Sequence, residues 1–310
     1  MTRPLTIATR GGALALAQTQ IVVAYLREKW PDMDCRIEVV TTHGDRDQRT
    51  ALWDLKGEGF FTSQLEQAVL AGQADVAVHS LKDLPTRQAE GLCIAAVCDR
   101  RFPEDGLVAA AEVRSLEDLG RGAKVGTSSL RRAAQVRHLR PDVRVVPLRG
   151  NVTTRLSRVE EGHIDAVILA RAGLERLGLA GRIGAILDPR QFIPAAGQGA
   201  LAVQARSDDR RTCERVGAID DPLARTLAEA ERQVLISTGC GCHAPVGAFA
   251  EMADGRVRLH ALMADPEGSR LVRLQVEGPP DRPLALAQQI AADLLKEIGA
   301  QPRPRLRERG

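Results

Sequence analysis

Short apolar runs alternate with longer stretches of helical periodicity along the first two-thirds of the chain. Buried strands read as nearly continuous apolar runs, whereas surface helices carry apolar residues every three to four positions. The pattern predicts strands at 5–9, 36–42, 75–80, 92–97, 123–127, 143–148 and 165–170, and helices at 13–29, 61–71, 129–139, 152–161 and 172–177. Such alternation is typical of an α/β fold with doubly wound, parallel or mixed sheets that carry helices on both faces.

Two segments interrupt this alternation and predict crossings between two lobes. RRFPEDG at 100–106 is charged and kinked, and IPAAGQGA at 193–200 is rich in proline and glycine. We expect lobe 1 to hold residues 1–99 and 200–217, and lobe 2 to hold residues 105–193. A chain that leaves one lobe and later returns to it predicts a hinge with a cleft between the lobes.

The last third has a different pattern. An amphipathic helix is expected over 221–237, with Asp220 or Asp221 as its N-cap and Pro222 in its first turn. Strand-like runs at 246–252, 256–263 and 270–277 and a helix over 284–297 follow. They predict a small α+β domain, residues 222–300, with a three-stranded antiparallel sheet. The proline- and arginine-rich tail 301–310 is expected to be disordered.

Composition narrows the classes of function. The 310 residues carry a net charge of +3, too small to indicate a polyanion such as nucleic acid as partner, and 3% aromatic residues leave little for stacking bases. Apolar runs are shorter than a membrane span, and the polar N-terminus has no signal-peptide core, so we expect a cytoplasmic protein without membrane contact. Six cysteines without a C-x-x-C pair are expected to be reduced thiols.

Arginine outnumbers lysine 38 to 5, and several arginines stand where a strand leads into a helix. Base composition of the gene explains much of this excess, yet the placement is suggestive of anion binding. Helix N-termini offer free N–H groups, and guanidinium groups bind carboxylates in a bidentate manner. Three such junctions together predict a polyanionic ligand; they carry Arg10, Thr127, Ser129, Arg131, Arg132, Arg149 and Arg155.

In the segment VHSLKDLP at 78–85, a buried strand is followed directly by charged residues. Ser80, Lys82 and Asp83 follow the apolar run, and Pro85 blocks further pairing. One interpretation is a solvated turn with a neighbouring ion pair. The other is a carboxylate presented at the carboxyl end of a strand, where open α/β sheets bind their ligands.

Two cysteines, Cys240 and Cys242, lie in the glycine-rich segment TGCGCHAPVGA. A metal site is one interpretation, but the chain offers no distant second pair of ligands for it. A glycine-rich exposed loop fits a reactive thiol better.

Together, VHSLKDLP, GTSSLRR, LRGNVTTRL, IPAAGQGA and GCGCHAPVGA resemble the porphobilinogen deaminase (hydroxymethylbilane synthase) family across roughly residues 4–300. The resemblance implies a three-domain transferase of tetrapyrrole biosynthesis, whose first two domains are similar to two-lobed solute-binding proteins. It implies that four porphobilinogen molecules are joined head to tail, with loss of ammonia, to give hydroxymethylbilane. It also implies a dipyrromethane cofactor held by a cysteine thioether, no metal, and a monomer.

The resemblance assigns roles to residues of this chain. Asp83 is implied as the catalytic carboxylate and Cys242 as the covalent anchor of dipyrromethane. Further cofactor contacts are implied for Ser80, Lys82, Thr127, Ser129, Arg131 and Arg132. Substrate contacts are implied for Arg10, Arg149, Arg155, Arg176 and Gln198.

Some positions depart from the family pattern. Gly12 stands where a serine is common, His243 replaces a glutamine, and Glu58 takes the place of a loop lysine, with Lys56 two residues earlier. A carboxylate facing an anionic chain is unfavourable, so two other functions stay open. They are a catalytically weakened paralogue and a two-lobed anion-binding module.

Overall fold

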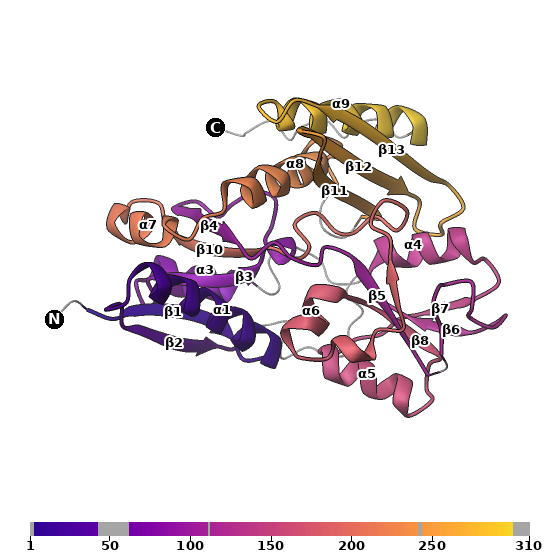
Figure 1. Ribbon diagram of the computed structural model, residues 1–310, viewed down its shortest axis with the longest axis horizontal. Coiled ribbons are helices and arrows are strands. Elements are labelled where there is room, and N and C mark those ends of the chain that lie inside the picture. The colour runs from indigo at the N-terminus through magenta and orange to yellow at the C-terminus, as the bar shows by residue number, and fades with distance from the viewer. Residues whose placement is uncertain (1–2, 43–61, 111, 241–243, 300–310) are drawn as a thin grey trace.

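The computed structural model describes residues 3–42, 62–110, 112–240 and 244–299. Its strands form two five-stranded mixed sheets and one three-stranded antiparallel sheet. In Figure 1 the first sheet lies on the left, the second on the right, and the third above them under helix α9. The predicted α/β class and the predicted antiparallel C-terminal sheet are therefore confirmed.

The first sheet has the strand order β2-β1-β3-β10-β4. Strands β1 and β2 are parallel, as are β1 and β3, while β10 runs antiparallel to both β3 and β4. Helices α1 and α7 cover one face, and helix α3 covers part of the other. These elements are β1 (Leu5–Arg10), α1 (Ala13–Lys29), β2 (Cys35–Val40), α3 (Ser63–Leu70), β3 (Val76–Ser80), β4 (Leu92–Cys98), β10 (Leu201–Arg206) and α7 (Arg210–Gly217).

The second sheet has the order β7-β6-β8-β5-β9 and is covered by α4 on one face and by α5 and α6 on the other. Strand β5 is the antiparallel partner of both β8 and β9. The elements are β5 (Asp105–Ala109), β6 (Lys124–Gly126), α4 (Leu130–Leu139), β7 (Arg144–Val146), α5 (Val152–Glu160), β8 (Ala166–Ala170), α6 (Arg171–Arg176), the 3-10 turn η3 (Ala180–Arg182) and β9 (Ala185–Leu187).

Alternating side chains explain why both faces of each sheet are apolar. In β8, Ile168 points toward the α4 side, whereas Val167 and Leu169 pack with Leu156 of α5. A strand buried on both faces needs apolar residues at every position, which is what the runs in the sequence supply.

The C-terminal unit packs two helices on its sheet. Helix α8 (Pro222–Thr238) begins at Asp221, whose carboxylate accepts hydrogen bonds from the N–H groups of Leu223 and Ala224, and Pro222 occupies the first turn as predicted. The sheet consists of β11 (Val246–Ala253), β12 (Arg256–Ala264) and β13 (Leu271–Gly278), and α9 (Pro283–Ile298) completes the core.

Four strands and α-helices were not predicted: β5, β9, β10 and α7. The first of these strands begins inside the charged segment that the sequence marked only as a crossing. The second is three residues long, and α7, RRTCERVG, has too few apolar residues for a clear period. Among the described residues, no helix is long and apolar enough to span a membrane.

Strand direction brings the functional segments to common edges. The carboxyl end of β3 meets the start of β10, because Ser80 pairs with Leu201. In the second sheet, the carboxyl end of β8 meets the start of β5, because Ala170 pairs with Asp105. Both crossings between the sheets therefore pass along the edges where the strands end.

Candidate active site

The carboxyl end of β3 presents Ser80, Lys82 and Asp83. The chain turns there through the 3-10 turn η2 (Leu81–Asp83). The Ser80 hydroxyl accepts a hydrogen bond from Gln18 Nε2 at 2.8 Å, and Lys82 Nζ donates to Gln198 Oε1 at 3.1 Å. Asp83 is exposed, so its carboxylate is accessible to a ligand.

The segment after β6 uses its hydroxyl groups to hold the chain. Ser129 is the N-cap of α4, and Thr127 Oγ1 accepts a hydrogen bond from the Ser129 N–H at 3.1 Å. Ser128 bonds both the carbonyl and the N–H of Leu148, which joins this segment to the end of the neighbouring strand. Thr127 and Ser129 thus lie where predicted, with part of their hydrogen-bonding capacity used by the backbone.

Arg131 and Arg132 both turn inward to the buried carboxylate of Asp105. Arg131 Nη2 lies 2.8 Å from Asp105 Oδ2, and Arg132 Nη2 lies 2.7 Å from Asp105 Oδ1. Burial raises the pKa of Asp105, but the two guanidinium groups outweigh it and hold that pKa well below its ordinary value. Asp105 therefore stays charged and fixes both arginines.

Gln198 links this buried cluster to the end of β3. Its side-chain N–H groups donate to the Pro103 carbonyl at 2.8 Å and to Asp105 Oδ1 at 2.9 Å, while its carbonyl accepts from Lys82. Gln198 is 1% exposed. A residue in the second crossing thus connects one sheet's strand end with the other sheet's arginine pair.

Arg149 and Arg155 extend the positive region from the junction before α5. Asn151 caps this helix by accepting the Thr154 N–H at 2.8 Å. Arg155 Nε donates to the Gly150 carbonyl at 2.8 Å. Arg149 Nη1 is buried and has no hydrogen-bond partner among the residues that the structure describes.

The pKa values report how crowded these cations are. The pKa of Lys82 is lowered to about 8 by burial and by Arg132, against the opposing effect of Asp83. The pKa of Arg155 is lowered to about 10 by burial and by Arg132 and Arg149, again opposed by Asp83. Residues from both sheets therefore share one electrostatic site, in which several cations lie near Asp83 and Asp105.

Arg10 lies at the end of β1, close enough to His79 to affect its titration. Burial, together with the charge of Arg10, lowers the pKa of His79 to about 4, so this imidazole is neutral at physiological pH. His79 is buried in β3 and its Nε2 has no hydrogen-bond partner among the described residues.

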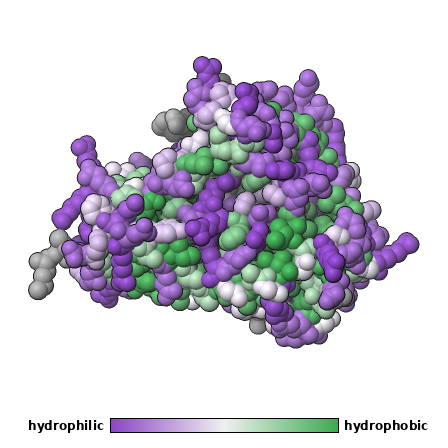
Figure 2. Space-filling view, in the orientation of Figure 1, coloured by the Kyte–Doolittle hydropathy of each residue, from purple (hydrophilic) through white to green (hydrophobic). Residues whose placement is uncertain are grey.

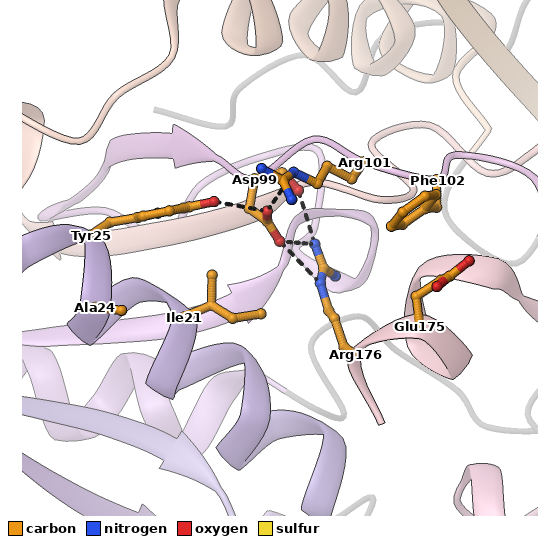
Figure 3. Close-up of a pocket in the computed structure, with 8 residues that line it drawn as sticks. All are labelled: Ile21, Ala24, Tyr25, Asp99, Arg101, Phe102, Glu175 and Arg176. Atoms are coloured by element: carbon orange, nitrogen blue, oxygen red, sulfur yellow. Dashed lines mark hydrogen bonds and ion pairs between the residues drawn. The ribbon is translucent and has the colours of Figure 1, made fainter. Parts of the chain in front are cut away.

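Arg176 has different neighbours from the other predicted anion-binding arginines. Its guanidinium group contacts Asp99 and the carbonyl of Gly199, and its side chain is 8% exposed. Figure 3 shows it beside a cavity of about 380 Å³ whose lining also includes Tyr25 and Phe102. The guanidinium group of Arg176 thus bonds to residues of both crossings.

The predicted anchor Cys242 lies outside the described residues, as do His243, Lys56 and Glu58. Its neighbour Cys240 packs against the core of the C-terminal unit, and its thiol lies 3.7 Å from the Thr238 carbonyl. Gly12 is the N-cap of α1 and provides no side-chain cap.

Sequence reasoning missed Asp105, which holds three of the predicted site residues in place. The sequence does show an aspartate directly before the apolar run GLVA, and the predicted arginine pair follows 26 and 27 positions later. Because the strand itself was not predicted, its first residue could not be placed at the strand edge.

The sheets and the strand edges define an α/β protein with a cation-rich site. Residues 5–214 match the family model "Porphobilinogen deaminase, dipyromethane cofactor binding domain", and residues 226–296 match the model of the porphobilinogen deaminase C-terminal domain. The chain belongs to the porphobilinogen deaminase family.

Full-length relatives agree with this assignment. A porphobilinogen deaminase of Desulforudis audaxviator is 45% identical over 300 residues, covering 97% of this chain and 96% of the relative. Another from Deinococcus radiodurans is 43% identical over 302 residues, covering 96% and 97%.

Among solved structures, a probable amino-acid ABC transporter extracellular-binding protein of Bacillus subtilis overlaps with a TM-score of 0.43 at 12% identity, covering 70% of this chain and 89% of its own. The fold assignment rests on the strand order given above.

Proposed function

We propose that this protein is a working porphobilinogen deaminase. It joins four porphobilinogen molecules head to tail, releases ammonia at each condensation, and gives hydroxymethylbilane for tetrapyrrole biosynthesis. The observation that carries this proposal is the shared positive site of Lys82, Arg149 and Arg155 beside Asp83. Each added pyrrole brings an acetate and a propionate group, so the growing chain is the polyanion that such a site binds.

The residues of this site fit a dipyrromethane primer. Arg149 Nη1 is buried without a partner among the described residues, and burial together with neighbouring arginines lowers the pKa values of Lys82 and Arg155. Carboxylate groups of the primer would supply both hydrogen-bond acceptors and negative charge. When bound, dipyrromethane supplies the nucleophilic pyrrole carbon to which the first substrate is added.

Different residues would hold the primer and the incoming pyrroles. We infer that Cys242 anchors the primer and that the primer contacts Ser80, Lys82, Thr127 and Ser129. Arg131 and Arg132 are occupied by Asp105, so they would contribute chiefly positive potential and their remaining N–H groups. Arg10, Arg149 and Arg155 would contact the carboxylates of substrate pyrroles, whereas Gln198, expected from the resemblance to do so, is buried and would hold Lys82 in place.

Asp83 would carry the proton chemistry. Loss of ammonia from the aminomethyl group leaves positive charge on the pyrrole, and a carboxylate stabilises that charge and exchanges a proton at the amine. Asp83 is exposed at the strand end, and its charge acts on both Lys82 and Arg155. Asp83 lies near Arg155, whereas Asp105 is already paired with Arg131 and Arg132.

Localisation, oligomeric state and domain boundaries complete the proposal. We infer a cytoplasmic monomer whose lobes have the boundaries 1–99 with 200–217 and 105–193, and whose C-terminal domain spans 222–300. The three separate sheets support this division.

Turnover of porphobilinogen tests the proposal directly. The purified protein is incubated with porphobilinogen, and the product is oxidised and measured as uroporphyrin. A working enzyme consumes substrate and releases ammonia in equal amounts. Tight binding without ammonia release would instead support the two-lobed anion-binding module, and slow turnover that Glu58→Lys restores would support the weakened paralogue.

Intact-mass measurement tests the anchor. We expect one protein plus two linked pyrrole units, retained in Cys240→Ser and lost in Cys242→Ser. Cys240 is a matched control because it is two residues away and packs against the C-terminal core. An adduct that peptide mapping places on Cys240 would overturn the assignment.

A further inference from the structure

Arg176 joins the two chain segments that cross between the sheets. Its Nε and Nη2 atoms lie 3.2 and 3.0 Å from Asp99 Oδ2, and Nη2 also lies 3.0 Å from the Asp99 carbonyl. The same Nη2 lies 2.6 Å from the carbonyl of Gly199. Asp99 stands at the start of the first crossing and Gly199 at the end of the second, so one guanidinium group bridges both.

Asp99 is held from both sheets at once. Tyr25 of α1, which packs on the first sheet, donates its hydroxyl to Asp99 Oδ1 at 3.0 Å. Arg176 of α6, which follows β8 of the second sheet, binds the other carboxylate oxygen. Figure 3 shows Asp99 between these two side chains, with Arg101 as a third neighbour at 3.3 Å.

The two crossings approach so closely that side chains would not fit between them. Gly199 has a φ of 91°, and a Cβ atom there would lie 2.4 Å from the carbonyl oxygen of Arg101. The Arg101 N–H also donates to the Gly199 carbonyl at 3.3 Å. Asp99 and Phe102 have φ values of 48° and 54°, which residues other than glycine adopt only when surrounding contacts hold them there.

This contact is connected to the catalytic strand end by the backbone. The residue after Gly199 is Ala200, whose carbonyl accepts the Leu81 N–H at 3.0 Å. Leu81 directly precedes Lys82 and Asp83. A displacement of the second crossing would therefore move the carboxylate proposed for proton transfer.

A cavity lies beside these polar contacts. The cavity of about 380 Å³ lies between α1, the first crossing and α6, where Ile21, Ala24, Phe102 and Glu175 line it. Figure 2 shows hydrophilic residues between two more apolar areas of this face of the molecule. The bonds of Asp99 thus join side chains from both sides of this cavity.

We propose that Arg176 is a positioning residue: through Asp99 and Gly199 it fixes the angle between the two sheets and the place of Asp83, and it does not bind substrate carboxylates. The family resemblance assigned it to the substrate. The inference rests on the proposed condensation reaction, so wild-type turnover is established before the variants are compared.

A double-mutant cycle in kcat/KM separates the two roles. The variants are Arg176→Leu, Asp99→Asn and the two combined, all as cofactor-loaded enzyme. We expect each single change to lower kcat/KM about tenfold, because a buried charge-assisted bond is lost. The kcat/KM of the double variant should stay within about threefold of that of the less active single variant. Losses that multiply would mean that Arg176 acts on the substrate itself and would overturn the proposal.

A lysine variant gives a second comparison if the leucine variant does not fold. Arg176→Lys keeps the charge, but a single ammonium group cannot reproduce the planar fork that reaches Asp99 and Gly199 together. We expect this variant to lose as much kcat/KM as Asp99→Asn. Nearly full retention would indicate a simple charge effect on the substrate and would contradict the positioning role.

Small-angle X-ray scattering tests the same proposal without turnover. Both Arg176→Leu and Asp99→Asn should broaden the distance distribution of the substrate-free protein. Arg182→Leu is the matched control, because Arg182 forms an exposed ion pair with Glu160 at 2.6 Å within the same part of the chain. Scattering curves of the Asp99 and Arg176 variants that coincide with the wild type would refute the positioning role even in an active enzyme.

Discussion

Arg132 Nη2 lies 2.7 Å from Asp105 Oδ1, and the side chain of Asp105 is fully buried. This carboxylate is the counter-charge that allows two adjacent arginines to be buried at the start of α4. Removing one partner of a buried ion pair is costly because the remaining charge is left without compensation.

Asp105→Asn should therefore destabilise the protein by about 3–5 kcal/mol in the free energy of unfolding. Chemical denaturation of the holoenzyme measures this change. Asp165→Asn is a suitable comparison, since the Asp165 carboxylate accepts a hydrogen bond from the N–H of the exposed residue Lys124 in the same sheet. Equal losses in both variants would show that the buried arginine pair does not depend on Asp105.

The lowered pKa of Lys82 predicts a pH effect on substrate capture. Burial lowers the pKa of Lys82, so this residue loses its positive charge as the pH rises through about 8 rather than near 10.5. Because the charged form attracts carboxylates, kcat/KM should fall above pH 8, and Lys82→Arg should move this decline to higher pH.

Lys124→Arg is the control for this profile, since Lys124 is exposed at the start of β6. It should leave the alkaline limb of the profile in place. A limb that stays unchanged in Lys82→Arg would assign the titration to another group.

Arg155 and Arg158 provide a matched pair on helix α5. Arg155 lies in the cation cluster, whereas Arg158 forms an exposed pair with Glu161 at 3.3 Å. Arg155→Leu should remove a charge-assisted bond to a substrate carboxylate, worth about 1.5–3 kcal/mol, and partly built chains should accumulate on the enzyme. Intact-mass spectra during turnover should show these species in Arg155→Leu and not in Arg158→Leu; the same ladder in both would contradict a specific site.

Asp83→Asn should keep the fold and the bound primer but lose nearly all turnover. An amide cannot take up the proton or balance the positive charge left when ammonia departs. Single-turnover ammonia release and the intact mass of the unreacted protein report the two properties separately. Near-normal release from the asparagine variant would leave Asp83 with a structural role only.

His79 predicts a loss of stability in acid. Its pKa is lowered to about 4 in the folded protein, so between pH 6.5 and 4 the unfolded chain binds a proton that the folded one does not. The free energy of unfolding should therefore fall with pH in this window, by about 1 kcal/mol per pH unit.

His79→Gln should flatten that slope, whereas His163→Gln should not, because the side chain of His163 is 57% exposed. Denaturation curves at several pH values measure both. Identical slopes in the wild type and His79→Gln would place the acid sensitivity elsewhere.

Much of the fold could be predicted because its strands are buried on both faces. The run VAVHS of β3 and the run AVILA of β8 are apolar enough to stand out without any alignment. Strand β5 did not stand out, since its first residue is an aspartate whose charge is balanced by arginines 26 and 27 positions away. A charge balanced by residues so far away in the sequence leaves no pattern among its own neighbours.

The site was predictable only in part, for the same reason. Residue types at strand ends identified Lys82, Asp83 and Arg149 as candidates. Which arginine meets a carboxylate of the protein itself and which one lacks a partner depends on the tertiary structure. Arg131 and Arg149 read alike in the sequence, yet the first is bound to Asp105 and the second has a buried Nη1 without a partner in the described chain.

The position of β10 also determines the order in which the protein can assemble during synthesis. All strands of the second sheet lie between Asp105 and Leu187, so that sheet has its full set of strands while the chain is still growing. The first sheet has a vacant place between β3 and β4 until Leu201–Arg206 leave the ribosome. The first sheet is therefore completed after the second sheet, although most of its strands are synthesised earlier. A nascent chain that stalls before Leu201 would leave the edges of β3 and β4 unpaired and prone to aggregation.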